Sequence, residues 1–131
     1  MVPELYQRAC TAAQSGDMAL SVALLRQFAE TKADTMFHAF ARFHIGTALL
    51  DGVGVPADRT AGFRELLAGA EAGDPRAMNA VAVCYEVGTG TDIDWKAADF
   101  WYSRAVECGD RCAVRNQNLF LGKNFSEGLF I

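Results

Sequence analysis

The side chains that could carry out chemistry in this sequence do not fall into the spacings that known reactions require. None of the four serines is followed three residues later by Lys, so the Ser-x-x-Lys motif of penicillin-interacting enzymes is absent. The sequence also lacks the His-Glu-x-x-His and Gly-x-Ser-x-Gly motifs. Two Gly-x-Gly segments, 52–54 and 88–90, lack the third glycine of a dinucleotide-binding loop. We therefore expect a non-enzymatic protein without catalytic residues or a cofactor.

The candidate metal ligands are equally sparse. His38 and His44 are the only histidines, and a separation of six residues places them on different parts of a helix face. Packing or hydrogen bonding is therefore the expected role of both rings. Asp92 and Asp94 could together hold a hard cation, but Asp94 is better explained as the cap of a helix. The sequence predicts no metal site.

The cysteines bear on the cellular compartment. They form no Cys-x-x-Cys pair and have no metal-type spacing to histidine. Cys108 and Cys112 are four residues apart, which allows either a disulfide in an oxidising compartment or two idle thiols in a reducing one. Residues 1–6 lack the basic start of a signal peptide, and no apolar run follows them. We expect a cytoplasmic protein, and the redox state of the Cys108–Cys112 pair stays open.

Composition restricts the class of protein further. The chain has 131 residues, of which 51% are hydrophobic and 21% charged, as in a globular domain of ordinary size. Alanine occurs 22 times and proline three times, which favours helices. No segment approaches the ~20 apolar residues of a membrane-spanning helix. The net charge of −4 argues against general binding to the phosphate backbone of nucleic acid.

The sequence repeats itself with a period of 36 residues. A repeat of this length is typical of solenoids built from helix pairs. The matched positions include glycines that end helices and aspartates that cap them. Eight coincidences occur in one register: Gly52 with Gly88, Gly54 with Gly90, Asp58 with Asp94, Ala61 with Ala97, Glu71 with Glu107, Gly73 with Gly109, Asp74 with Asp110 and Ala77 with Ala113.

These signals predict about seven helices and no strand. A helix pair with a tight turn at residues 15–17 is expected within 3–31, and it resembles a tetratricopeptide hairpin. We divide the rest into one repeat over 34–73, a second over 74–109 and a truncated third over 110–131. The spacing from capping aspartate to terminal glycine is 18 residues in the first and third units and 14 in the second. The first helices of the outer units are therefore expected to be one turn longer.

Two segments carry a resemblance to a known family. They read Ile45-Gly46-x-x-Leu49-x-x-Gly52-x-Gly54-Val55-x-x-Asp58-x-x-Ala61 and Tyr85-x-x-Gly88-x-Gly90-x-x-x-Asp94-Trp95-Lys96-Ala97-x-x-x-Trp101-Tyr102-x-x-Ala105. Both resemble Sel1-like repeats, and the resemblance extends over residues 34–128. It implies a right-handed α-α solenoid of antiparallel helix pairs that binds proteins or peptides. A weak hydrolase acting on β-lactams is an alternative by family analogy only, because no nucleophile–base pair supports it.

The first helices of successive pairs line the concave surface in a solenoid of this kind. On the helix expected over 34–50, an apolar stripe occupies the side opposite Ala41, Ile45, Ala48 and Leu49, which are expected to pack on the partner helix. A surface that is apolar at one end and basic at the other suits an amphipathic or acidic segment. The predicted partner-binding residues are Met36, Phe40, Phe43, Thr47, Asn79, Val83, Glu86, Arg115, Leu119 and Lys123.

Three alternatives remain at this point. Met36, Phe40 and Phe43 could instead dock the N-terminal hairpin. An acidic strip over residues 86–99, on the convex side or an edge, could be the surface in use. Such a strip suits an immunity protein that neutralises a secreted bacterial toxin, and a toxin gene next door would support that role. The apolar end, Leu129-Phe130-Ile131, could mediate self-association.

Overall fold

The fold is built entirely from α-helices. The computed structural model describes residues 2–31 and 35–126, with side chains through residue 123, and this part of the chain contains no strand. The all-α prediction is therefore confirmed. The described helices are α1 (Glu4–Gln14), α2 (Met18–Ala29), α3 (Met36–Asp51), α4 (Arg59–Glu71), α5 (Pro75–Val87), α6 (Trp95–Glu107) and α7 (Arg111–Ser126).

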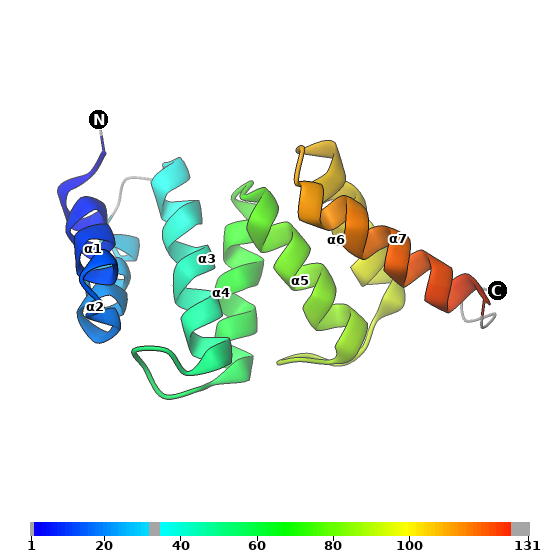
Figure 1. The fold of residues 1–131 in the computed structure, drawn as a ribbon, viewed down its shortest axis with the longest axis horizontal. Coiled ribbons are helices and arrows are strands. Elements are labelled where there is room, and N and C mark those ends of the chain that lie inside the picture. Colours follow the sequence, from blue (N-terminus) through cyan, green and yellow to red (C-terminus); the bar gives the residue numbers. More distant parts are fainter. Residues whose placement is uncertain (1, 32–34, 127–131) are drawn as a thin grey trace.

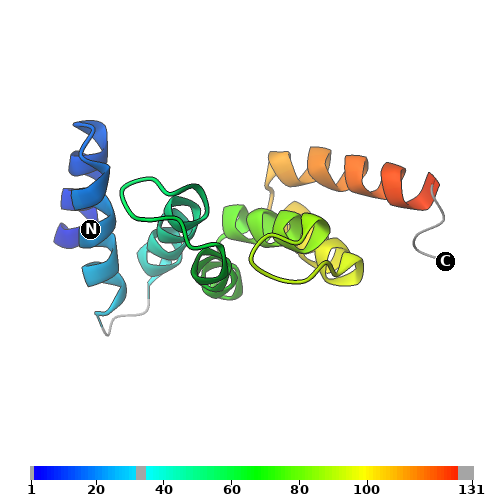
Figure 2. The ribbon, with the colours of Figure 1, turned by 90° about the horizontal axis from the view of Figure 1, so that it is seen from below.

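The helices follow one another along an elongated, curved stack (Figure 1). Contacts are densest within the pairs α1–α2, α3–α4 and α5–α6, and the successive pairs then pack on each other. Seen from below, α1–α2 at one end and α7 at the other rise on the same side of the central helices (Figure 2). The central odd-numbered helices α3 and α5 lie nearer this hollowed side than α4 and α6 do. We call this side the concave face.

The predicted caps are present and repeat in detail. Asp58 and Asp94 have the same backbone angles, φ −147° and ψ 96°, and each carboxylate accepts a hydrogen bond of 3.1 Å from the backbone three residues later. Gly52 and Gly88 end α3 and α5 with φ of 70° and 80°, in the left-handed region. The outer first helices have 16 residues and the middle one 13, as the spacing predicts. The repeat boundaries at 34, 74 and 110 stay an interpretation of the sequence.

The second glycine of each loop joins neighbouring pairs by close backbone contact. A β-carbon on Gly54 would lie 2.6 Å from the carbonyl group of Met18, the first residue of α2. A β-carbon on Gly90 would lie 2.8 Å from the carbonyl carbon of Arg59, the first residue of α4. Both glycines also have positive φ. Each loop therefore presses on the start of the preceding even-numbered helix, and only glycine fits there.

The start of α3 differs from expectation. The helix begins at Met36 with Thr35 as its cap, whereas the sequence suggested a start at residue 34, which lies outside the described residues. The backbone N–H of Thr35 donates to Nδ1 of His38 over 3.3 Å, and Nε2 of the same ring lies 2.8 Å from the Thr31 hydroxyl. The buried His38 ring thus bonds both Thr31 and Thr35, in agreement with its predicted role in packing and hydrogen bonding.

The two apolar sides of α3 pack differently from the prediction. Ala41, Ile45 and Leu49 belong to one core cluster with the N-terminal hairpin, including Leu25 and Phe28, and Ala61 of α4 packs against the same cluster. The close contact between the backbones of α3 and α4 depends on a pair of glycines, one on each helix. A β-carbon on Gly46 would lie 2.6 Å from the Leu66 side chain, and one on Gly62 would lie 2.9 Å from the Gly46 carbonyl oxygen. Glycine lets these two backbones approach where an alanine would clash.

The remaining side of α3 packs toward the next repeat. Phe43 and Leu50 pack on a core cluster of α4, α5, α6 and α7 that includes Leu66 and Val81. Of the three residues in the alternative raised above, Phe43 therefore packs toward the next repeat, while Phe40 lies beside Phe37 with ring centroids 5.9 Å apart; that Met36, Phe40 and Phe43 together dock the N-terminal hairpin stays a prediction. Phe37 contacts that hairpin, with its ring centroid 5.2 Å from that of Tyr6. The predicted self-association segment 129–131 lies outside the described residues.

Candidate protein-binding surface

An arginine covers two of the predicted aromatic residues on the concave side of α3. The guanidinium carbon of Arg76 lies 4.5 Å from the ring centroid of Phe43 and 5.3 Å from that of Phe40. Cation–π contacts of this kind hold a guanidinium in place while leaving part of it in water. Arg76 also forms an ion pair of 3.2 Å with Asp74, whose side chain is 1% exposed, whereas the Arg76 side chain is 46% exposed. The three side chains Phe40, Phe43 and Arg76 form what we call the arginine patch.

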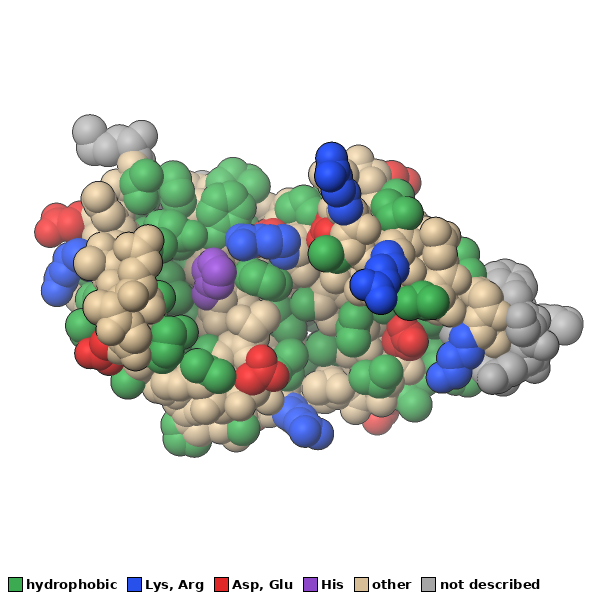
Figure 3. Space-filling model, viewed as in Figure 1, with side chains coloured by type: hydrophobic (Ala, Val, Ile, Leu, Met, Phe, Trp, Pro, Cys, Tyr) green, Lys and Arg blue, Asp and Glu red, His purple; other side chains and the backbone are tan. Residues whose placement is uncertain are grey.

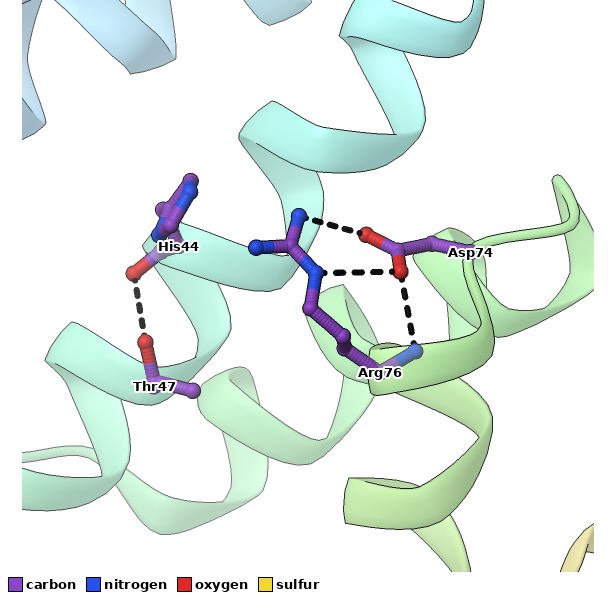
Figure 4. A network of polar contacts seen from close by, with 4 residues as sticks. All are labelled: His44, Thr47, Asp74 and Arg76. Carbon is purple, nitrogen blue, oxygen red and sulfur yellow. Dashed lines mark hydrogen bonds and ion pairs between the residues drawn. The ribbon is translucent and has the colours of Figure 1, made fainter. Parts of the chain in front are cut away.

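Asp74 fixes the position of Arg76. Its Oδ1 accepts a hydrogen bond of 2.9 Å from the backbone of Arg76 at the start of α5, and its two oxygens also meet Nε and Nη2 of the guanidinium (Figure 4). The remaining nitrogen, Nη1, has no hydrogen-bond partner among the described residues and points toward His44 of α3. The arginine therefore keeps one donor group for an external acceptor.

His44 lies beside the arginine patch and is half-buried. The ring centroids of Phe43 and His44 are 5.3 Å apart. Burial lowers the pKa of His44, and the positive charge of Arg76 lowers it further. The imidazole is therefore neutral at neutral pH, and it adds no positive charge beside the guanidinium. The hydroxyl of the neighbouring Thr47 donates a hydrogen bond of 3.0 Å to the backbone carbonyl oxygen of His44.

Two predicted polar residues are occupied within the chain. The side-chain oxygen of Asn79 accepts a hydrogen bond of 3.1 Å from Asn116, which links α5 to α7. Glu86 accepts a hydrogen bond of 2.7 Å from the hydroxyl of the buried Tyr102. These two side chains therefore fasten helices to one another, and only the parts left exposed could meet a partner.

The other predicted residues are open to solvent. Met36 is 51% exposed at the start of α3, Val83 is 36% exposed on α5 and Leu119 is 63% exposed on α7. Arg115 and Lys123 are also exposed on α7, and Arg111, one turn before Arg115, extends the same row. No carboxylate of the described residues forms an ion pair with these three cations. Figure 3 shows the resulting division: hydrophobic side chains gather over the N-terminal helices, and Lys and Arg side chains stand out over α5 and α7.

An apolar hollow that the sequence did not reveal lies between α1, α2, α3 and the loop after α3. Its volume is about 420 Å³, and its walls include Ala9, Ala13, Val22, Leu25, Ala48 and Val53. His44 and Thr47 line the side nearest the arginine patch. We call it the N-terminal cleft. Its volume is within the range of pockets that hold small ligands or anchoring side chains.

A second, shallower hollow lies on the other side of the arginine patch. Its volume is about 550 Å³, and Tyr6, Phe40, Arg76 and Arg111 are among its lining residues. The starts of α5 and α7 meet there. The arginine patch thus stands between two hollows, one apolar and one lined by Arg76 and Arg111 together with Asp74 and Asp110.

Sequence reasoning found the aromatic stripe of α3 but missed Arg76, His44 and the cleft. The signal for Arg76 was its position directly after Asp74 and Pro75 at the start of a helix, where its guanidinium can pair with the carboxylate of Asp74 that caps the same helix. No signal in the sequence marks the cleft, because its walls come from helices whose mutual distance depends on packing.

The described residues offer no metal site, since no group of three potential ligands comes together among them. All four cysteines are free thiols: Cys84 is buried, and Cys10, Cys108 and Cys112 are exposed. Among the described helices, none is long and apolar enough to cross a membrane.

Known proteins with a similar fold identify the architecture. No family model matches the sequence, and no curated protein matches it. A protective antigen of uropathogenic Escherichia coli, which displays an SLR fold, aligns over 95% of this chain with a TM-score of 0.79 and 24% identity, although the chain spans only 26% of that antigen. A Sel1 repeat protein from Oxalobacter formigenes aligns over 87% of this chain and 85% of its own length, with a TM-score of 0.74 and 25% identity. The chain has the fold of the Sel1-like repeat proteins.

Proposed function

We propose that the chain is a non-enzymatic protein-binding module that holds a segment of a partner protein against its concave face. The observation that carries the proposal is the row of Arg111, Arg115 and Lys123, which are exposed and unpaired among the described residues of a chain whose net charge is −4. Local positive charge on an acidic protein favours an acidic partner and steers its approach. The fold itself generally serves protein–protein interaction.

Apolar side chains beside the cations complete the surface. Val83 and Leu119 are exposed on successive odd-numbered helices, and the exposed Met36 extends the apolar part toward the N-terminal end. Contacts of both kinds suit an amphipathic segment with acidic and apolar side chains. The interaction surface proposed from the sequence comprises Met36, Phe40, Phe43, Thr47, Asn79, Val83, Glu86, Arg115, Leu119 and Lys123, to which we add Arg76 and Arg111.

The test begins by identifying the partner in native lysate with this chain as bait and measuring its affinity by calorimetry. Leu119→Asp and Val83→Asp should each weaken binding at least about tenfold, because a buried apolar contact would become a desolvated charge. Val114→Asp is the matched control: Val114 is 44% exposed on α7, five residues before Leu119 and on another side of the helix. Equal affinities for all three variants and the wild type would contradict binding on the concave face.

A second pair of variants tests the charges. Arg115→Glu should weaken binding and reduce its dependence on salt, whereas Arg64→Glu on α4 should do neither. Within this proposal, an adaptor and an immunity protein differ only in the identity of the partner. A cytoplasmic location would suit both, because a reducing compartment keeps the exposed Cys10, Cys108 and Cys112 reduced.

A further inference from the structure

We infer that the N-terminal cleft receives the anchoring residue of that partner, a large apolar side chain, and that Arg76 binds a carboxylate close to it on the same segment. The inference rests on the proposed function and adds the partner's chemistry: an apolar residue next to Asp or Glu. Of the residues predicted from the sequence to bind a partner, only Thr47 lines the cleft.

The cleft has the size and lining of an anchor site. Its volume of about 420 Å³ exceeds that of one Leu, Phe or Trp side chain, and small residues, Ala9, Ala13 and Ala48, leave the space open. The side chains at its rim, Met18 and Val53, are 36% and 43% exposed although both are apolar. An apolar side chain entering from the concave face would cover these groups and displace water from them.

A chain of ring contacts joins the cleft to the arginine. His44 lines the cleft, its ring centroid lies 5.3 Å from that of Phe43, and the guanidinium carbon of Arg76 lies 4.5 Å from the centroid of Phe43. Neighbouring side chains in this series are therefore in direct contact. A carboxylate one to three residues from the anchor can therefore reach Arg76 without leaving the surface.

Arg76 is prepared to accept that carboxylate. Asp74 and the two aromatic rings hold the guanidinium, so little side-chain freedom remains to be lost on binding. Nη1 has no partner within the described residues and points out over His44 (Figure 4). Arg111 lines the hollow on the other side of Arg76 together with Asp74 and Asp110, and the exposed Arg115 follows one turn later on α7. Charge complementarity thus selects an acidic segment and disfavours a basic one.

The experiment selects ligands from a phage-displayed library of random twelve-residue peptides against the full chain. Enriched peptides should pair a large apolar residue with Asp or Glu. The best peptide is then synthesised and its affinity measured for two variants of the hairpin. Ala13→Leu fills the cleft from α1 and should weaken binding at least about tenfold. Ala23→Leu makes the same change at an exposed site of α2 outside the cleft and should leave affinity unchanged.

A double-mutant cycle tests the carboxylate. Replacing the acidic residue of the peptide by its amide should weaken binding about tenfold to the wild type and less than about twofold to Arg76→Gln. Because Arg76→Gln also leaves Asp74 without its cation, Arg76→Lys, which keeps the positive charge, is measured beside it and each variant is checked for native melting. Additive losses, with no coupling between peptide and Arg76, would overturn the carboxylate contact.

The outcomes separate the two proposals. Peptides that bind Ala13→Leu normally but fail to bind Leu119→Asp would overturn the cleft inference and leave the concave-face function standing. Peptides enriched in basic residues would overturn the acidic chemistry. Enrichment of no peptide, in a selection where a control peptide-binding protein succeeds, would count against the proposed function itself.

Discussion

The substitution Gly90→Ala tests how neighbouring repeats are joined. Gly90 has φ +70°, in the left-handed region that an alanine enters at a cost of about 1–2 kcal/mol. The added β-carbon would also lie 2.8 Å from the carbonyl carbon of Arg59 and 2.9 Å from Cβ of Phe63. The first contact is with backbone, so the loop or the start of α4 must move. Overpacking of this kind costs about 1–3 kcal/mol, which makes the total about 2–5 kcal/mol.

Gly109→Ala provides the matched control. Gly109 follows α6 with φ +90°, and a β-carbon there would meet no other atom within 4 Å. Its substitution should therefore cost only the backbone term, about 1–2 kcal/mol. The difference between the two variants measures the contact between the 88–90 loop and α4. Domains of this size are commonly stable by about 5–15 kcal/mol, which exceeds these losses except at their upper limit, so both variants should fold.

The assay is urea unfolding followed by circular dichroism at 222 nm. With a slope of about 2 kcal/mol per molar urea, Gly109→Ala should lower the midpoint by about 0.5–1 M and Gly90→Ala by about 1–2.5 M. The slope itself should stay the same if the solenoid still unfolds as one unit. Equal midpoints for the two variants would refute the reasoning, because the steric contact with Arg59 would then contribute nothing.

Three further predictions follow from burial and charge. Iodoacetamide at pH 8 should label Cys10, Cys108 and Cys112 in the native protein but not Cys84, because burial raises the pKa of Cys84 to about 11; intact mass should show three modifications before unfolding and four after it. The pKa of His44 is lowered in the folded state by burial and then by Arg76, so on acidification the unfolded chain binds the proton first. The free energy of unfolding should therefore fall as the pH drops below about 6.5. Urea titrations at pH 7.5 and pH 5.5 should show this loss for the wild type and a smaller loss for His44→Gln. Tyr102→Phe removes the donor to Glu86 and should cost about 1–3 kcal/mol in thermal unfolding, whereas Tyr85→Phe, whose hydroxyl has no such bond within the described residues, should cost less than about 0.5 kcal/mol.

The sequence by itself determined the helices and their ends. Asp58 and Asp94 cap the starts of α4 and α6, and Gly52 and Gly88 end α3 and α5. All four act through contacts with residues a few positions away, so the local sequence is enough to predict them. The same holds for the relative lengths of the first helices, which follow from the spacing of these signals. The start of α3 was misplaced because His38, a residue not usually found in capping boxes, completes the cap of Thr35.

Part of the candidate surface was also accessible from the sequence. The repeat register placed Phe43, Val83 and Leu119 on first helices, and the exposure of Val83 and Leu119 agrees with that placement. Helical periodicity separates one side of α3 from the other, but it does not say which neighbour each side meets. For that reason the prediction for Ile45 named α4 alone, whereas its core cluster also contains residues of the N-terminal hairpin.

Only the tertiary structure decided what lies between the helices. Gly46 and Gly62 set the close distance of α3 and α4, and alanines on α1 and α3 leave the N-terminal cleft open. Arg76 joins Phe40 and Phe43 across 33 to 36 positions of sequence through contacts that no local pattern encodes. The physical reason is that caps and turns are satisfied by backbone groups of the same segment, whereas clefts and cation–π contacts depend on how far apart side-chain packing holds separate helices.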